Sequence, residues 1–484
     1  MSTRVFERGE ENSATPDLLL REYWDVQYIS GPLVFLQHGG RFPTGAILEL
    51  VSAQGERRMG QILEASTTHA VVQVLQGTHG LDVQGTSVSL RDAAARIGVS
   101  KALIGRRFDG TGQPIDGLPP AAAKRSIEIQ GAAINPVARD KPEDFIETGI
   151  SSIDGFNTLV RGQKLPIFAG AGLPANQLAG LIVRQAATKG REEPFVVVFA
   201  AMGITERESD FFLRTFQEGG HGERVVAFIN RANDPAIERL FTPRCALTVA
   251  EYLAFEHDYQ VLVILTDMTN YCEALREVSS AREEIPGRRG YPGYMYTDLS
   301  SIYERAGRIR GKRGSLTQIP ILSMPDDDIT HPIPDLTGYI TEGQVVMSRA
   351  LHRQGVFPPV DVMPSLSRLM NNGIGESLTR ADHGPLAAQL YACYAQGRDI
   401  RKLMAIVGED ALSELDRKYL RFANEFDRRM IGQGQTRRTI EETLELGWQL
   451  MGIIPKEELT RVNKDLLNRY YCEIMEDGVH SPFI

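Results

Sequence analysis

The sequence predicts a mixed, three-domain chain: an N-terminal β-barrel, a central α/β domain built on a parallel sheet, and a C-terminal α-helical bundle. Three patterns predict this order. Short strand-like runs with glycine turns fill residues 20–95, apolar runs alternate with helical segments over 140–350, and apolar residues recur at helical spacing after 365. The 484 residues also exceed what one hydrophobic core supports. We place the domains at 1–95, 96–362 and 363–484.

The first domain is expected to be a small barrel. Strand-like runs at 33–36, 46–51 and 71–75 are separated by turn residues such as Gly39-Gly40. Short strands with frequent glycine turns are typical of antiparallel barrels. The glycine-rich passage 105–117 that follows predicts a reversing loop or a domain junction.

Continuous apolar strands define the central domain. Each of three apolar runs is followed by a helical segment: 195–199 by 206–218, 225–229 by a segment starting near Asp234, and 261–265 by 270–284. Strands that are apolar on both faces and alternate with helices indicate a parallel sheet covered on both sides.

Helical spacing dominates the rest of the chain. Leu386, Leu390, Tyr391 and Tyr394 recur on one face of a predicted helix, and later segments at 412–426, 440–450 and 456–475 are charged and helical in pattern. This end of the chain is therefore expected to form a helical domain.

Composition excludes several classes of protein. The formal net charge of −9 and the pI of about 5.6 argue against wrapping nucleic acid, which needs a basic face. The four cysteines are far apart and form no CxxC pair, so neither a zinc site nor a disulfide framework is expected, and each is interpreted as a small buried side chain. No run reaches the ~18 apolar residues of a membrane span, and residues 1–17 lack a signal-peptide core.

A glycine-bearing loop follows the first strand of the predicted sheet. The strand at 164–168 runs into residues 169–176, and a helix is expected to start near Gln177. Strand, glycine loop and helix are the context of a P-loop, whose main-chain N–H groups hold phosphates at a helix N-terminus.

The side-chain chemistry of a P-loop is missing from this segment. A working loop reads G-x-x-x-x-G-K-[ST]. Gly170 and Gly172 lie in the loop, but Ala169, Pro174, Ala175 and Asn176 stand at the fixed positions of the motif. Ala175 has no ammonium, Asn176 has no magnesium-binding hydroxyl, and Pro174 has no N–H. We expect weak or no nucleotide binding, and a plain strand-to-helix loop fits these residues equally well.

Asp267 ends the apolar strand at 261–265 after Thr266. A carboxylate at the tip of such a strand helps to hold magnesium in P-loop proteins. Many buried strands end in Asp, however, and on this feature alone a helix cap or turn is the favoured interpretation.

Several longer motifs are more specific. The segment 358–367, PPVDVMPSLS, matches the signature P-[SAP]-[LIV]-[DNH]-x-x-x-S-x-S of the nucleotide subunits of rotary ATPases, and Arg368 follows it directly. The chain also resembles V/A-type B subunits over four further segments, 105–110, 285–299, 326–340 and 389–395. It thus resembles the non-catalytic B subunit of V/A-type rotary ATPases over most of its length.

The resemblance implies an alternating ring of three catalytic A subunits and three B subunits around a rotating central stalk, with peripheral-stalk subunits outside. ATP or ADP with magnesium would bind at A–B interfaces built mainly by A, so the chain would be no enzyme in isolation and would hold no cofactor tightly. It would lie peripherally at the cytoplasmic face of a membrane. Catalytic relatives carry a glutamate directly after a glycine, whereas Gly203 is followed here by Ile204, and Glu206 comes two residues late.

Arg368 is the principal site residue that the resemblance implies. It would reach across the interface to the A-subunit nucleotide, where an arginine supplied in trans stabilises the transferring phosphoryl group. Without the resemblance, a salt-bridged arginine near a domain junction is favoured. Ser365 and Ser367 would shape the loop that presents it, which amounts to local turn hydrogen bonding.

Two further features have open interpretations. Tyr339 could line the degenerate nucleotide pocket, although a buried core tyrosine is the favoured alternative. Arg288 and Arg289 would form a flexible basic loop that faces the hexamer interior or the A subunit, and a solvated surface loop is nearly as good an interpretation.

Two rival functions remain at this stage. An independent hexameric ATPase, such as a secretion-type motor or a termination-factor-like helicase, needs its own lysine and glutamate, and Ala175 and Ile204 argue against it. A B subunit that binds a regulatory nucleotide would need contacts from aromatic side chains and main chain alone.

Overall fold

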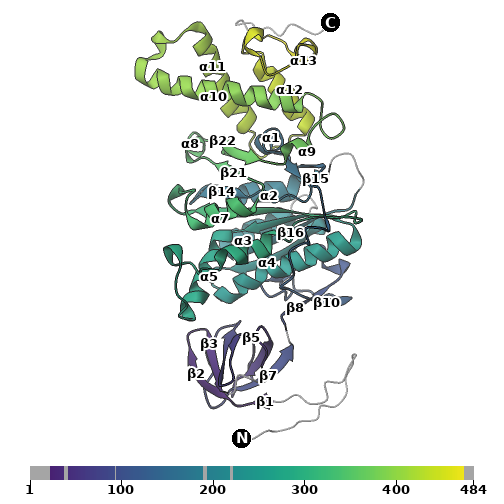
Figure 1. Ribbon diagram of the computed structural model, residues 1–484, viewed down its shortest axis with the longest axis vertical. Coiled ribbons are helices and arrows are strands. Elements are labelled where there is room, and N and C mark those ends of the chain that lie inside the picture. Colours follow the sequence, from purple (N-terminus) through teal and green to yellow (C-terminus); the bar gives the residue numbers. More distant parts are fainter. Residues whose placement is uncertain (1–21, 38–41, 93, 189–192, 218–221, 474–484) are drawn as a thin grey trace.

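The computed structural model describes residues 22–37, 42–92, 94–188, 193–217 and 222–473. Three domains follow one another along the long axis: a strand-rich domain at the N-terminal end, a sheet with helices in the middle, and helices at the C-terminal end (Figure 1). The polar stretch 1–17, the turn at Gly39-Gly40 and positions 474–475 of the last predicted helix lie outside the described residues.

The N-terminal domain is a curled, seven-stranded antiparallel sheet in the order β1-β7-β4-β5-β6-β3-β2 (Figure 1). Its strands are β1 (Glu22–Tyr23), β2 (Val26–Ser30), β3 (Leu33–Gln37), β4 (Ile47–Val51), β5 (Arg57–Ala65), β6 (His69–Val74) and β7 (Ser87–Asp92). Val34, Leu48 and Val72 are among the fully buried side chains that fill it. The three predicted strands are confirmed as β3, β4 and β6.

The central domain is built on a ten-stranded sheet whose main path runs β22-β21-β14-β20-β18-β16-β17-β9. Neighbours from β21 to β9 are parallel, whereas β22 is antiparallel to β21. The strands are β9 (Arg107–Asp109), β14 (Ile167–Gly170), β16 (Phe195–Ile204), β17 (Val225–Arg231), β18 (Gln260–Thr266), β20 (Ser315–Met324), β21 (Gly343–Met347) and β22 (Val360–Ser367), with β11 (Arg139–Asp140) and β19 (Gly307–Ile309) at the side. β22 runs across residue 363, where the sequence places the start of the helical domain.

Helices cover both faces of this sheet, as its continuous apolar strands predict. Along β16, Val196 and Val198 pack into one core, while Val197 and Phe199 pack into the other. The domain's helices are α1 (Ser151–Asp154), α2 (Ala175–Gln185), α3 (Glu206–Gln217), α4 (Ala236–Glu251), α5 (Met268–Ala281), α6 (Met295–Tyr303), α7 (Pro332–Ile340) and α8 (Arg349–Arg353). The first core includes residues of α4, α5 and α6, and the second includes residues of α2 and α3.

The glycine-rich passage 105–117 contains a strand that the loop prediction missed. Within it, β9 pairs in parallel with β17, and Phe108 stacks on Phe228 with ring centroids 5.3 Å apart. The chain reverses directly afterwards, because the N–H of Asp109 donates to the carbonyl oxygen of Gln113 at 2.8 Å. The passage is therefore an edge strand followed by a tight reversal.

Smaller sheets flank the main one. β8 (Arg96–Val99) pairs with β10 (Arg125–Glu128), and β12 (Phe145–Glu147) pairs with both β13 (Leu159–Val160) and β15 (Ala187–Thr188). These two small sheets attach the segments that contain β8, β10, β12, β13 and β15 to the central domain.

The C-terminal domain is helical, as predicted. It contains α9 (Met370–Gly373), α10 (His383–Val407), α11 (Glu414–Glu425), α12 (Ile440–Met451) and α13 (Lys464–Tyr470). Within the last predicted segment, 456–475, only Lys456–Glu458 and α13 are helical among the described residues. Trp448 of α12 donates to the buried carboxylate of Asp382 at 2.6 Å, which ties α12 to the start of α10.

Three of the four cysteines are buried, as expected of small core side chains, and Cys472 is half-buried. Burial raises the pKa of the Cys245 thiol to about 12 and that of Cys393 to about 11, so these thiols stay protonated. Over the described part of the chain, no helix combines the length and the apolar character needed to cross a membrane.

Candidate functional site

The loop between β14 and α2 leads from a strand of the parallel sheet directly into a helix, which is the context of a phosphate-binding loop. β14 lies between β20 and β21, and α2 begins at Ala175, directly after Pro174. The side chain of Asn176 is held by neighbours: its amide nitrogen donates to Glu208 at 2.8 Å, and its oxygen accepts from Thr266 at 3.4 Å. Ala175 is buried, so the position of the missing lysine faces protein.

An ion pair from elsewhere in the chain lies against this loop. A Cβ atom added to Gly170 would lie 1.8 Å from Oδ1 of Asp327. Arg349 donates to both carboxylate oxygens of Asp327, at 2.7 and 2.8 Å, and to the carbonyl oxygen of Ala171 at 2.9 Å. The hydrogen bonds from Arg349 lower the pKa of Asp327, so the carboxylate is ionised at neutral pH. This ion pair fills the space beside Gly170.

Sequence reasoning missed both members of this pair. Asp327 belongs to the acidic run 326–328 that carries part of the family resemblance, while Arg349 is the first residue of α8, 22 positions further on. Only the fold shows that they meet beside Gly170.

Asp267 is the N-cap of α5, which is one of the two interpretations that the sequence left open. Its Oδ1 accepts from the N–H of Thr269 at 2.8 Å and from that of Ser323 at 3.1 Å, and its Oδ2 accepts from the Ser323 hydroxyl at 2.5 Å. Burial raises the pKa of this carboxyl despite the three donors. Three protein donors thus bind the two oxygens of this carboxylate.

The position of the missing glutamate is also altered. β16 ends at Ile204, whose side chain is buried, and Glu206 starts α3. The carboxylate of Glu206 pairs with Arg231 on β17 at 3.3 Å, and both side chains are exposed. Glu206 thus pairs on the surface with the neighbouring strand.

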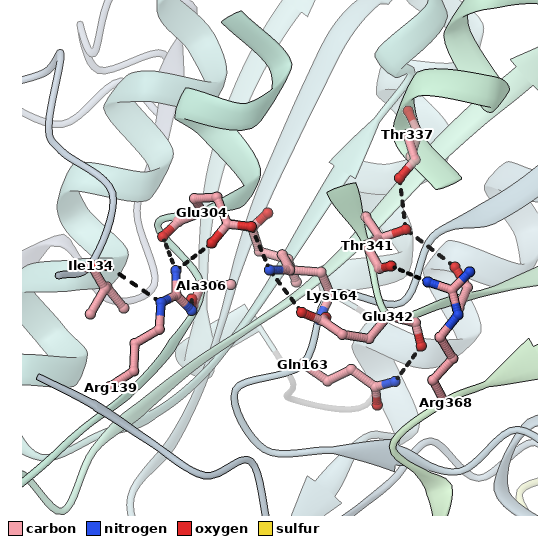
Figure 2. A network of polar contacts seen from close by, with 12 residues as sticks. Ile134, Arg139, Gln163, Lys164, Glu304, Ala306, Thr337, Thr341, Glu342 and Arg368 are labelled. Carbon is pink, nitrogen blue, oxygen red and sulfur yellow. Dashed lines mark hydrogen bonds and ion pairs between the residues drawn. The ribbon is translucent and has the colours of Figure 1, made fainter. Parts of the chain in front are cut away.

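Arg368 follows β22 directly and is anchored through its main chain and its side chain. Its N–H donates to the carbonyl oxygen of Glu342 at 3.0 Å, and its Nη1 donates to that of Thr341 at 3.1 Å (Figure 2). The residue is exposed, and among the described residues no carboxylate forms an ion pair with it. The salt-bridged arginine that the sequence also allowed is therefore not formed within the described chain.

Ser365 and Ser367 fix the strand that leads to Arg368. The Ser365 hydroxyl donates to the carbonyl oxygen of Asp361 at 2.6 Å and accepts from the N–H of Val346 at 2.9 Å. The buried Ser367 hydroxyl donates to the carbonyl oxygen of Thr158 at 2.9 Å and accepts from Gln163 at 2.9 Å. Only the bond to Asp361 is local, so the predicted turn hydrogen bonding is part of the arrangement, and the other bonds tie the end of β22 to remote segments.

Tyr339 is 73% exposed near the end of α7, so the interpretation as a buried core tyrosine is wrong. It is two residues before Thr341, whose carbonyl oxygen holds the Arg368 guanidinium.

Arg288 and Arg289 lie in an exposed turn and pair with Asp335 at 3.5 Å and Asp328 at 3.1 Å. The basic pair is therefore neutralised by the acidic segment that ends in α7.

No metal centre is evident: the described ranges bring together no group of three or more His, Cys, Asp or Glu side chains with the geometry to hold an ion. The site thus combines a loop without phosphate chemistry and an exposed arginine on a braced strand.

Comparisons with known proteins agree with this architecture. The model of the ATP synthase alpha/beta family, nucleotide-binding domain, matches residues 149–367, and that of the family's beta-barrel domain matches residues 26–90. The C-terminal domain of V and A type ATP synthase matches residues 372–471. These domain models cover the barrel, the α/β sheet and the helical bundle, and the chain belongs to the ATP synthase alpha/beta family, in its V/A-type branch.

Within that family the chain is similar to V-type beta chains. It is 60% identical to the "V-type ATP synthase beta chain" of two strains of Thermus thermophilus, over 96% of this chain and 99% of each relative. Among solved structures, the ATP synthase subunit NeqB from Nanoarcheaum equitans matches with a TM-score of 0.69 and 38% identity, covering 87% of this chain and 98% of that one. The predicted resemblance to the B subunit of V/A-type ATPases is confirmed.

Proposed function

We propose that the chain is a non-catalytic B subunit, which alternates with three catalytic A subunits in a hexameric head and completes each A-subunit ATP site with Arg368. The whole complex would couple ATP synthesis or hydrolysis to proton or sodium transport. The chain would contact the central-stalk rotor and the peripheral stalks, and would lie peripherally on the cytoplasmic face of the membrane.

The proposed non-catalytic role is supported mainly by the residues in and beside the loop after β14. It lacks the lysine and the hydroxyl of a P-loop, and the ionised Asp327 lies against Gly170 at the place where phosphate oxygens would come closest. Arg349 is bound to that carboxylate and to the loop carbonyl of Ala171, so its charge is not available to a nucleotide. The chain's own loop does not fit a bound triphosphate.

The observation that supports the role in trans is the exposed Arg368. Its strand lies at the edge of the sheet and is held by β21 and by the hydrogen bonds of Ser367, and within the described ranges its exposed guanidinium makes one hydrogen bond, to Thr341. Such an arginine can approach charge that develops on a phosphoryl group in a neighbouring subunit, and in related reactions this is worth ~10³ to 10⁵ in rate. Magnesium and ATP would be bound by A, and this chain would supply one positive charge in the transition state.

The experiment that tests the non-catalytic role compares ATP turnover and ATP binding of the purified chain alone with those of the chain mixed with its A partner. We expect no turnover and no saturable binding at micromolar ATP from the chain alone, and turnover when A is added. Robust ATPase activity of the chain by itself would contradict the proposal, and the independent hexameric ATPase would replace it.

A further inference from the structure

Both anchoring contacts of Arg368 end on one short turn, formed by Thr341 and Glu342 at the end of α7. The Thr341 carbonyl holds the guanidinium, and the Glu342 carbonyl holds the main-chain N–H. The orientation of the arginine therefore depends on how firmly this turn is held.

Glu342 is held mainly by Lys164, which lies just before β14, and Gln163 also donates to its carbonyl oxygen at 3.3 Å. The N–H of Glu342 donates to the carbonyl oxygen of Lys164 at 3.1 Å, and the Glu342 carboxylate accepts from the N–H of Lys164 at 2.9 Å. The same carboxylate pairs with Nζ of Lys164 at 2.8 Å. Main chain and side chain of the two residues are thus bound to each other just before β14 (Figure 2).

The lysine is buried and belongs to a longer chain of alternating charges. Its side chain is 4% exposed, and Nζ also pairs with Glu304 at 2.9 Å. Glu304 in turn pairs with Arg139 at 2.6 Å, and Arg139 is fixed by the carbonyl oxygens of Ala306 and Ile134 (Figure 2). The order is Glu342, Lys164, Glu304, Arg139, so the charges of the four side chains cancel.

Because Lys164 is buried, removing the charge of one of its partners should shift its side chain toward the other. A buried ammonium needs its carboxylate partners, because it cannot regain water without moving its backbone. Loss of the Glu342 charge would leave Lys164 attracted to Glu304 alone, on the side away from Arg368. The turn at Thr341–Glu342 would keep its main-chain bond to Lys164 but lose the ion pair that fixes the Glu342 side chain.

We propose that Glu342, Lys164 and Glu304 form a positioning network that sets the orientation of the Arg368 guanidinium toward the partner's nucleotide. The proposal rests on the role in trans proposed above. The three residues touch no substrate, and they act only through the turn that holds Arg368.

The test uses hexamers reconstituted from the full-length chain and A, with Glu342→Gln as the first variant. The glutamine keeps the size and an accepting oxygen but removes the charge. We expect kcat to fall roughly tenfold while KM for MgATP stays nearly unchanged, because A binds the ground state and misorientation affects the transition state. Lys164→Met should give the same pattern. The kcat of the double variant should be little lower than that of either single variant, because both substitutions disrupt the same network.

Asp116→Asn serves as the matched control. Asp116 forms an equally protected ion pair with Arg106 at 2.5 Å, beside β9 at the opposite edge of the sheet from β22. An unchanged kcat in assembled Glu342→Gln hexamers would overturn the proposal, and so would an equal fall of kcat in the Asp116→Asn control. Arg368→Ala is measured in parallel: if that variant turns over normally, the role in trans fails, whereas if only Glu342→Gln is normal, the network alone fails.

Discussion

The carboxylate of Asp327 lies against the main chain of Gly170, so closely that a Cβ atom on Gly170 would be 1.8 Å from Asp327 Oδ1. In a working phosphate loop, this space beside the glycine belongs to the ligand. Here the exposed carboxylate of Asp327 lies in it, held in place by Arg349. On the proposed non-catalytic role, the surroundings of the loop would exclude a phosphate as well as its sequence.

Restoring the two motif side chains should therefore not restore nucleotide binding. For Ala175→Lys with Asn176→Thr we expect no saturable MgATP binding below millimolar concentrations in isothermal titration calorimetry, since the Asp327–Arg349 pair fills the space beside Gly170 and Pro174 lacks an N–H. Adding Pro174→Gly and Asp327→Ala should strengthen binding by roughly tenfold or more, about 1.4 kcal/mol. Micromolar binding by the first pair of changes alone would show that the ion pair is no barrier.

Asp267 should be a structural residue whose loss lowers stability. Asp267→Ala removes the cap of α5, leaves the N–H of Thr269 without its acceptor, and leaves the N–H of Ser323 with only the Thr269 hydroxyl. We expect the free energy of unfolding to fall by about 2 to 3 kcal/mol in urea titrations. The ATPase rate of assembled hexamers at low temperature should be preserved, and a large loss of rate without loss of stability would point to a role in magnesium binding instead.

Glu238 should make stability depend on pH. Burial, with repulsion from Asp109 and Asp234, raises its pKa to about 7 from an ordinary 4.5. The folded state thus holds a proton that the unfolded state releases, so this contribution to stability is present below about pH 4.5 and is lost as pH rises through about 7. Glu238→Gln should stabilise the chain by about 2 kcal/mol at pH 8 and by little at pH 4.5. Melting temperatures of both proteins at the two pH values test this, and equal differences at both would contradict it.

Gly343 should be essential to the placement of Arg368. It has φ of +140°, and a Cβ atom there would lie 2.0 Å from the carbonyl oxygen of Leu366, two residues before the arginine. Gly343→Ala would push β22 away from β21, and we expect a clear fall of hexamer ATPase rate together with a lower melting temperature. Gly355→Ala, also at positive φ but with open space at its Cβ, is the control and should leave the rate unchanged.

The sequence was sufficient for the domain order and for the strands with continuous apolar runs, such as β16 and β18. Other strands of the same sheet could not be found in this way. β20 carries Pro320 in its middle and mixes polar with apolar residues, and β9 is three residues long inside a glycine-rich passage. Both become strands because buried neighbours supply partners from distant parts of the chain, which local periodicity does not encode.

In the candidate site, too, some features are visible in the sequence and others only in the fold. The absence of the motif lysine, which Ala175 replaces, could be recognised from the sequence because a motif is a local pattern. The pairing of Asp327 with Arg349 and the fixing of Glu342 by Lys164 depend on contacts between remote segments. The exposure of Tyr339 likewise depends on which face of α7 packs against the sheet.

The central claim is that Arg368 acts on a nucleotide bound by a neighbouring subunit, and ATP turnover of hexamers carrying Arg368→Ala tests it most directly. Arg368→Lys, which keeps the charge but not the planar guanidinium, is the matched variant, and size-exclusion chromatography confirms assembly. We predict that Arg368→Ala lowers kcat by at least ~10³-fold with the hexamer intact, and that lysine restores little of it. Normal turnover of a fully assembled Arg368→Ala hexamer would contradict the account.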